Sequence, residues 1–165
     1  MFNQLKPNSC SDFYDAAECL NLILRYDRNL KRITQNDSRD VYITSMNIND
    51  HPDLIYALEE GNQTFYKFAT TNHVECFFGR YDTGCHYSAQ HSDCQPHGQD
   101  QRKLSFSILL NEEFEGGELV FDGESIEKRK GILTIFPSFV PHAVNPITSG
   151  VRYAIFGFLR GPHWR

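Results

Sequence analysis

Three runs in the C-terminal half decide the fold: LSFSILL at Leu104–Leu110, ILTIF at Ile132–Phe136 and VRYAIFGFL at Val151–Leu159. All three are short and rich in aromatic and β-branched side chains, a composition typical of β-strands. Segments with the chemistry of turns separate the strands of this half, at Asn111–Gly117, Asp122–Gly123, Pro137–Pro141 and Pro146–Gly150. Short strands at near-even spacing, with turns between them, favour a sandwich or a barrel.

Working outward from these runs, the same criteria predict further strands. They are expected at Val41–Asn47, Thr64–Thr70, Val74–Tyr81, Glu118–Phe121 and His142–Val144. Most of them follow residue 60, so the strand-rich region occupies the larger, C-terminal part of the chain.

The first third of the chain has helical spacing instead. Ser11 is expected to cap a helix that runs to about Arg32. Its apolar positions follow the helical period, at Phe13, Ala16, Ala17, Leu20, Ile23 and Leu24. A second helix is expected to start after Asn49 or Asp50. Pro52 would lie in its first turn and Gly61 at its end. Helices followed by strands predict an α+β fold in which the helices buttress one sheet.

The composition is that of a folded protein: 165 residues, 19.1 kDa, 40% hydrophobic and 22% charged. This length fits one domain. The formal net charge of -5 disfavours a nucleic-acid partner, because proteins that bind phosphate backbones usually carry a basic surplus. No apolar run approaches the roughly 20 residues that a membrane-spanning helix needs.

The N-terminal residues MFNQLKP have neither the charged start nor the apolar run of a signal peptide. The chain has five cysteines, at Cys10, Cys19, Cys76, Cys85 and Cys94. An odd count without a secretory signal predicts reduced thiols in an intracellular, cytoplasmic protein. Two disulfides with one free thiol remain the alternative.

Among the seven histidines, His91 is the informative one because Asp93 follows it two places later. Residues i and i+2 of a strand point to the same face. An imidazole and a carboxylate would then project side by side and supply two ligands of a 2-His-1-carboxylate metal site, the arrangement that suits non-haem Fe(II). Taken alone, the pair is a weak signal, and a polar loop beside Gln95 and Pro96 is the default interpretation.

A second histidine must come from far away in the sequence, and His142 is the best candidate because it follows an apolar strand and a turn. Ten residues later, Arg152 begins a strongly apolar strand. Burying a guanidinium within a strand costs free energy unless an anion pairs with it. The planar fork of Arg152 matches a carboxylate, which is either a ligand's or that of an internal Asp or Glu.

In combination, His91-x-Asp93, His142 and Arg152 resemble the 2-oxoglutarate- and Fe(II)-dependent dioxygenases, in particular the prolyl 4-hydroxylase-like branch. Intervening pieces agree in order and spacing: LSFSILLN at 104–111, GGELVF at 116–121, GILTIFPS at 131–138 and GVRYA at 150–154. The resemblance runs from about Tyr81 to Phe158, nearly half of the chain.

The resemblance implies a double-stranded β-helix, a jelly-roll barrel with the N-terminal helices packed on its larger sheet. It implies one dioxygenase domain over 1–165, with a helical buttress and first strands in 1–75 and the metal-binding barrel core in 76–160. The resemblance makes His91, Asp93 and His142 the ligands of Fe(II), and Arg152 the partner of the distal carboxylate of 2-oxoglutarate. Tyr81 is then expected to hydrogen-bond the co-substrate and Ser105 to line the pocket. A second tyrosine that related enzymes carry near position 109 is replaced here by Leu109.

The implied reaction consumes O2 and 2-oxoglutarate, releases succinate and CO2, and hydroxylates an unactivated C–H bond, with ascorbate as a supporting reductant. Because related halogenases replace the carboxylate ligand by a small residue, Asp93 favours hydroxylation. The implied substrate is a prolyl or peptidyl residue or an amino-acid-like molecule. Substrate walls are expected at Asp82–Gln90, Cys94–Arg102 and Gly161–Arg165, with Gln95–Arg102 as a mobile lid.

Three other interpretations compete with this one. A structural zinc site would use Cys85, His86, Cys94 and His97, but their spacing matches no zinc pattern. A non-enzymatic, cupin-like metal-binding or sensor module would share the barrel, but it has no need of the cation at Arg152. Nucleic-acid demethylases of this class pair that arginine with another six residues later, where this chain has Phe158.

Overall fold

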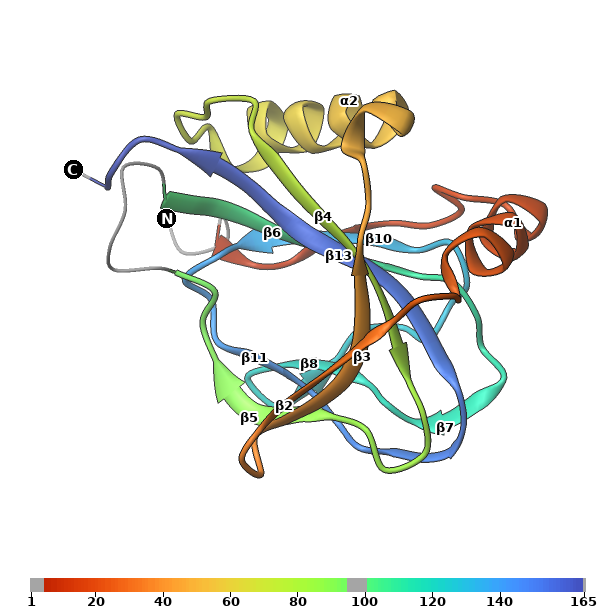
Figure 1. The fold of residues 1–165 in the computed structure, drawn as a ribbon. Coiled ribbons are helices and arrows are strands. Elements are labelled where there is room, and N and C mark those ends of the chain that lie inside the picture. The colour runs from red at the N-terminus through yellow and green to blue at the C-terminus, as the bar shows by residue number, and fades with distance from the viewer. Residues whose placement is uncertain (1–4, 95–100, 165) are drawn as a thin grey trace.

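The computed structural model describes residues 5–94 and 101–164. Within them, antiparallel strands form a seven-stranded sheet of order β1-β10-β6-β13-β4-β3-β2, a four-stranded sheet of order β5-β11-β8-β9 and the pair β12-β7 (Figure 1). The strands of the large sheet are β1 Asn8–Cys10, β2 Lys31–Gln35, β3 Arg39–Ser45, β4 Val74–Tyr81, β6 Gln101–Leu109, β10 Leu133–Pro137 and β13 Arg152–Gly161. The others are β5 Tyr87–His91, β7 Phe114–Gly116, β8 Leu119–Phe121, β9 Glu124–Ser125, β11 His142–Val144 and β12 Ile147–Gly150.

The large sheet separates two cores, because its strands alternate their side chains between two faces. On β6, Leu104, Phe106 and Ile108 belong to the core beneath the helices, whereas Ser105 and Ser107 face the inside of the barrel. In Figure 1, α1 (Ala16–Tyr26) and α2 (Pro52–Gly61) lie on one side of the large sheet, and β5, β8 and β11 on the other. This arrangement confirms the predicted α+β jelly roll with helices on its larger sheet.

The first helix is shorter than the expected span from Ser11 to Arg32. It begins at Ala16 because Asp15 and Glu18 form a reciprocal capping box, in which each side chain accepts from the other's backbone N–H at 2.8 Å. It ends at Tyr26. Its last two expected residues, Lys31 and Arg32, instead begin strand β2, which pairs with β3 in a hairpin.

The buried face of α1 also differs from the expectation. Cys19 and Leu22 are buried, while Leu20 and Leu24 are 55% and 61% exposed. Counting Cys19 as an apolar residue would have placed the stripe correctly, because cysteine is among the residues most often buried.

The second helix ends at Gly61 as predicted, but its start and its continuation differ. Its expected cap, Asn49 or Asp50, lies in a 3-10 turn at Ile48–Asp50 that is capped by Asn47, and α2 begins at Pro52. After Gly61 the chain continues as a π-helical turn at Asn62–Tyr66.

The strand predicted at Thr64–Thr70 is therefore wrong. The aromatic residues of this segment pack as anchors instead: the Tyr66 hydroxyl donates to Ile135 O at 2.9 Å, and the Asn62 side chain exchanges two hydrogen bonds with the backbone of Phe68. Their composition suits a strand, but these long-range contacts hold them in a turn.

Two of the expected turns contain short strands. Asn111–Gly117 includes β7 and Pro146–Gly150 includes β12, and these two strands pair with each other. Gln101 and Arg102, expected in the lid, begin β6, and the rest of that segment, 95–100, lies outside the described residues.

Near the C-terminus, Trp164 stands edge-on to Phe68 at 4.8 Å between ring centroids, and Lys103 Nζ lies 3.6 Å from the Trp164 ring.

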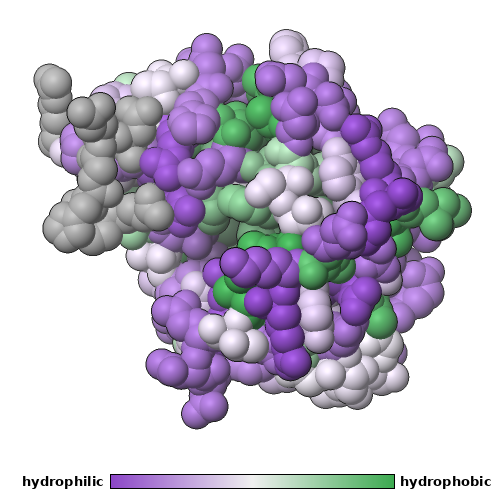
Figure 2. Space-filling model, viewed as in Figure 1, coloured by the Kyte–Doolittle hydropathy of each residue, from purple (hydrophilic) through white to green (hydrophobic). Residues whose placement is uncertain are grey.

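The view in Figure 2 shows a hollow near the centre of the molecule, with hydrophobic side chains deep inside and hydrophilic ones around it. In the described part of the chain, no helix has the length and apolarity to cross a bilayer.

The core beneath the helices is expected to carry much of the stability. Phe106 is 2% exposed, and Phe106→Ala should lower the free energy of unfolding by about 3–5 kcal/mol because it leaves a cavity in a packed interior. Urea denaturation measures the change. Tyr56→Ala is the control, since Tyr56 is 68% exposed and its loss should change stability by no more than about 0.5 kcal/mol. Equal losses for the two variants would contradict this account of the core.

Candidate metal centre

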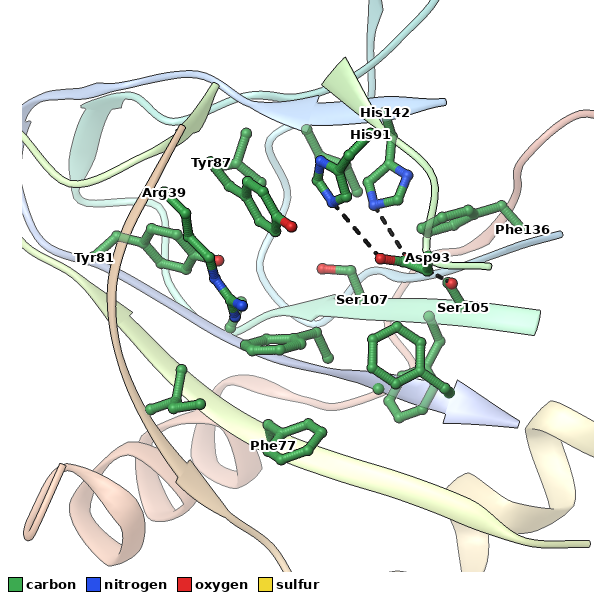
Figure 3. A pocket seen from close by; sticks show the side chains of 18 of the residues that line it. Arg39, Phe77, Tyr81, Tyr87, His91, Asp93, Ser105, Ser107, Phe136 and His142 are labelled. Atoms are coloured by element: carbon green, nitrogen blue, oxygen red, sulfur yellow. Dashed lines mark hydrogen bonds and ion pairs between the residues drawn. The ribbon is translucent and has the colours of Figure 1, made fainter. Parts of the chain in front are cut away.

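Two imidazoles and a carboxylate converge at one end of the barrel (Figure 3). His91 is the last residue of β5 and His142 the first of β11, and the antiparallel pairing of these strands sets the two residues directly opposite each other. Asp93 follows β5 by two residues. One ligand atom from each of the three side chains lies within 4.8 Å of the others.

The hydrogen bonds of the imidazoles define which nitrogen faces the cluster. His91 Nδ1 lies 2.9 Å from Ala89 O, and His142 Nδ1 lies 3.0 Å from Val140 O. A carbonyl oxygen only accepts, so each Nδ1 carries the proton and each Nε2 keeps a free lone pair. The Nε2 atoms of His91 and His142 lie 3.6 and 3.3 Å from oxygens of Asp93.

Asp93 is held by its own set of contacts. Its backbone N–H donates to Ser138 O at 2.8 Å, and Ser105 Oγ donates to Asp93 Oδ2 at 2.7 Å. Ser105 also lies 3.0 Å from Ser138 Oγ. The Ser105 bond fixes Oδ2, the oxygen nearest His142 Nε2, and leaves Oδ1 as the oxygen nearest His91 Nε2. Ligand side chains receive this kind of support at metal sites.

Aromatic rings hold the imidazoles in place. The Tyr87 ring stacks on His91 with centroids 3.6 Å apart and planes 12° apart. The Phe136 ring meets His142 edge-on at 4.7 Å between ring centroids.

Burial lowers the pKa of His91, and nearby His142 lowers it further, against the opposing effect of the Ala89 carbonyl. The His91 imidazole is therefore neutral near pH 7 and has a lone pair to offer.

Arg152 lines the same cavity and has no carboxylate partner among the described residues. It is 4% exposed, faces Tyr81 across the β13–β4 pairing, and its guanidinium lies 5.0 Å from the Tyr81 ring centroid. Its Nε atom is buried and has no hydrogen-bond partner among the described residues. Burial lowers the pKa of Arg152, and Tyr81 partly offsets that effect. The internal salt bridge that the sequence left open is thus not formed with any described Asp or Glu.

One cavity of about 210 Å³ contains all the site residues that the sequence singled out: Tyr81, His91, Asp93, Ser105, His142 and Arg152. Phe77, Phe136 and Phe156 add apolar wall. Leu109 lines a smaller neighbouring cavity together with Thr134 and Arg152, so no tyrosine stands at that position beside the guanidinium.

Sequence reasoning missed Arg39 and Tyr87, which also line the large cavity. Tyr87 lies in a segment that was expected to be a variable wall and is strand β5. Arg39 lies between the expected first helix and the expected strand from Val41, so no pattern drew attention to it.

The zinc alternative is not supported by the part of the chain that the structure describes, where His91, Asp93 and His142 are the cluster suited to a metal. The buried Cys85 and the half-buried His86, which bonds Ser88, do not join such a cluster. His97 lies outside the described residues.

Comparison with known proteins agrees with this geometry. The barrel is similar to the viral collagen prolyl hydroxylase from Paramecium Bursaria Chlorella virus-1 (TM-score 0.78, 20% identity, 94% of this chain and 96% of the other). It is equally similar to a Pseudomonas putida prolyl-4-hydroxylase (TM-score 0.78, 23% identity, 95% and 93%). These likenesses confirm the double-stranded β-helix fold.

The sequence pattern of the 2OG-Fe(II) oxygenase superfamily matches residues 76–160, and the chain belongs to this family. A PKHD-type hydroxylase from Parvibaculum lavamentivorans is 36% identical over 95 residues, which is 54% of this chain and 43% of that protein. The match thus spans less than half the length of this curated relative.

The isolated charge of Arg152 is expected to cost stability when nothing is bound. Arg152→Met should raise the free energy of unfolding of the metal-free protein by about 1–3 kcal/mol, because it removes a buried cation that has no partner. Chemical denaturation of the two metal-free proteins measures the difference. The control is Arg80→Met, since Arg80 pairs with Asp27 and Asp82 and its loss should destabilise. A similar destabilisation by both variants would show that Arg152 has a partner.

Proposed function

We propose that this protein is an Fe(II)- and 2-oxoglutarate-dependent dioxygenase that hydroxylates an unactivated C–H bond. The observation that carries the proposal is the placement of a His91–Asp93–His142 cluster and an unpaired buried guanidinium in one cavity. Two neutral imidazoles and a carboxylate are the ligand set of non-haem Fe(II) oxygenases. The buried Arg152 supports an anionic co-substrate, which a purely metal-binding module would not require.

Some residues of this chain would hold the metal and the co-substrate, and others would exclude water from them. His91, Asp93 and His142 would hold the metal by one face and leave the other positions to ligands. Ser105 would keep the Asp93 carboxylate oriented toward the metal. Arg152 would pair with the distal carboxylate of 2-oxoglutarate, and Tyr81 would form part of the wall beside that co-substrate. When bound, ferrous iron and 2-oxoglutarate supply the oxidising chemistry, in which O2 converts the keto acid to succinate and CO2 and one oxygen atom enters the C–H bond. The phenylalanines of the wall would exclude water.

The proposed substrate is a prolyl or peptidyl residue or an amino-acid-like molecule. The names of the similar proteins, which include a PKHD-type hydroxylase and prolyl hydroxylases, support this class. We further propose that 1–165 forms one oxygenase domain, in which 76–160 contributes the metal ligands and 1–75 the helical buttress and first strands.

Metal affinity is expected to depend on the Ser105 hydrogen bond. Ser105→Ala should weaken binding of Fe(II), or of Co(II) as its spectroscopic substitute, by about 10- to 100-fold because the carboxylate of Asp93 loses its donor. Anaerobic titration against a chromogenic chelator measures the dissociation constant. Ser107→Ala is a matched control on the same strand, because Ser107 lines the cavity without bonding any of the three ligands. Equal weakening by the two variants would contradict the role given to Ser105.

The central test is turnover of 2-oxoglutarate. Purified protein with Fe(II), ascorbate and 2-oxoglutarate should release succinate slowly on its own, and faster with a prime substrate that gains 16 Da in a mass-spectrometric screen of peptides and metabolites. Arg152→Gln should raise the KM for 2-oxoglutarate by roughly 10- to 100-fold, the cost of a lost charge-assisted pair, and leave the affinity for Fe(II) unchanged. His142→Ala should lose the metal. Iron binding without any succinate, across the whole panel, would favour a binding module over an enzyme.

A further inference from the structure

Arg39 is a second cation in the cavity, and it approaches from a different wall. It is the first residue of β3, which lies at one side of the barrel where Asp40 bridges to His86 ahead of β5. Its guanidinium lies 4.8 Å from the centroid of the Tyr87 ring, and Tyr87 in turn stacks on His91. Figure 3 shows the Arg39 side chain pointing into the space beside Tyr81 and Tyr87.

Arg39 has no carboxylate partner among the described residues, and its Nε atom is buried without a hydrogen bond. Neighbouring arginines are paired: Arg32 with Asp40, Arg80 with Asp27 and Asp82, and Arg102 with Glu75. Among the described residues that line the cavity, Asp93 is the one acid, and its oxygens already face His91, His142 and Ser105. Arg39 therefore presents an unneutralised charge to whatever enters.

The charge balance of the loaded site rests on the proposed function. With ferrous iron and 2-oxoglutarate bound, the charges in the cavity sum to one positive charge more than the bound anions neutralise. A ferrous ion brings two positive charges, Arg152 and Arg39 bring one each, and Asp93 removes one. The two carboxylates of 2-oxoglutarate neutralise two of the remaining three. One positive charge is left in a cavity with apolar walls, where an unpaired charge is costly and an incoming anion is strongly favoured.

We propose that Arg39 binds a carboxylate of the prime substrate, so that the substrate is a carboxylate-bearing, amino-acid-like molecule. Three of the described arginines line the cavity, and Arg102 pairs with Glu75. The other two lie against different tyrosine rings, Arg152 against Tyr81 and Arg39 against Tyr87, which favours two different carboxylates as their partners. Because Tyr87 stacks on His91, a carboxylate held by Arg39 lies on the wall that carries a metal ligand. A neutral residue in the middle of a peptide would leave Arg39 unpaired.

The test compares carboxylates with their neutral amides in binding, under conditions that prevent turnover. Anaerobic Fe(II)–2-oxoglutarate protein is titrated calorimetrically with N-acetyl amino acids and the matching primary amides. At least one acid should bind about 10- to 100-fold more tightly than its amide, the difference expected of a charge-assisted bond. Arg39→Gln should abolish this preference, and Arg39→Lys should retain part of it. Arg32→Gln, on the same hairpin but paired outside the cavity, should keep the full preference.

The inference is overturned if amides bind as tightly as acids, if no acid of the panel binds, or if Arg39→Gln keeps the preference. It is also overturned if Arg39→Gln raises the KM for 2-oxoglutarate as Arg152→Gln does, because Arg39 would then belong to the co-substrate site. Succinate release without prime substrate is measured on the same proteins. Its presence together with a failed carboxylate preference refutes only the role of Arg39, whereas its absence both here and with every prime substrate of the panel refutes the proposed function as well.

Discussion

The antiparallel pairing of β5 with β11 is the constraint on which the site depends. It places His91 opposite His142, two residues that are 51 positions apart in the sequence. A slip of one residue would turn one imidazole to the other face of the sheet. The register of this pairing is secured on both sides. β11 also pairs with β8, and Asp93, which follows β5, donates its backbone N–H to Ser138 O.

The large sheet provides the rigid floor for this pairing. Its inner face carries polar residues that the site needs, such as Ser105 and Arg152, and its outer face carries the apolar residues that hold the helices. A hydroxyl and a guanidinium on the inner face can be tolerated because Phe106, Ile108 and Ile155 of the same strands pack beneath the helices. The free energy lost by placing polar groups on the inner face is thus offset by apolar packing on the outer face of the same strands.

The sequence was sufficient for the barrel and for the residues that the structure gathers in it. His91 and Asp93 are two positions apart, and His142 and Arg152 lie beside apolar runs, so local pattern marks all four as candidates, and the family resemblance of their combination gives them their roles. The errors lie where tertiary contacts override composition. Thr64–Thr70 has the composition of a strand but is held in a turn by Asn62 and by the Tyr66 hydroxyl. Arg39 has no signal of its own, because its position depends on a hairpin whose first strand, β2, was not predicted from the sequence.

Trp164 offers a practical consequence. It is the single tryptophan of the chain, and its indole packs on Phe68 and on the ammonium group of Lys103. Lys103 stands two residues ahead of Ser105 on β6 and accepts a backbone hydrogen bond from Ser138. Indole fluorescence therefore arises from one corner of the protein, a short distance along the strand from the carboxylate ligand. Emission from the unlabelled protein can report the loosening of that corner separately from the melting of the helices.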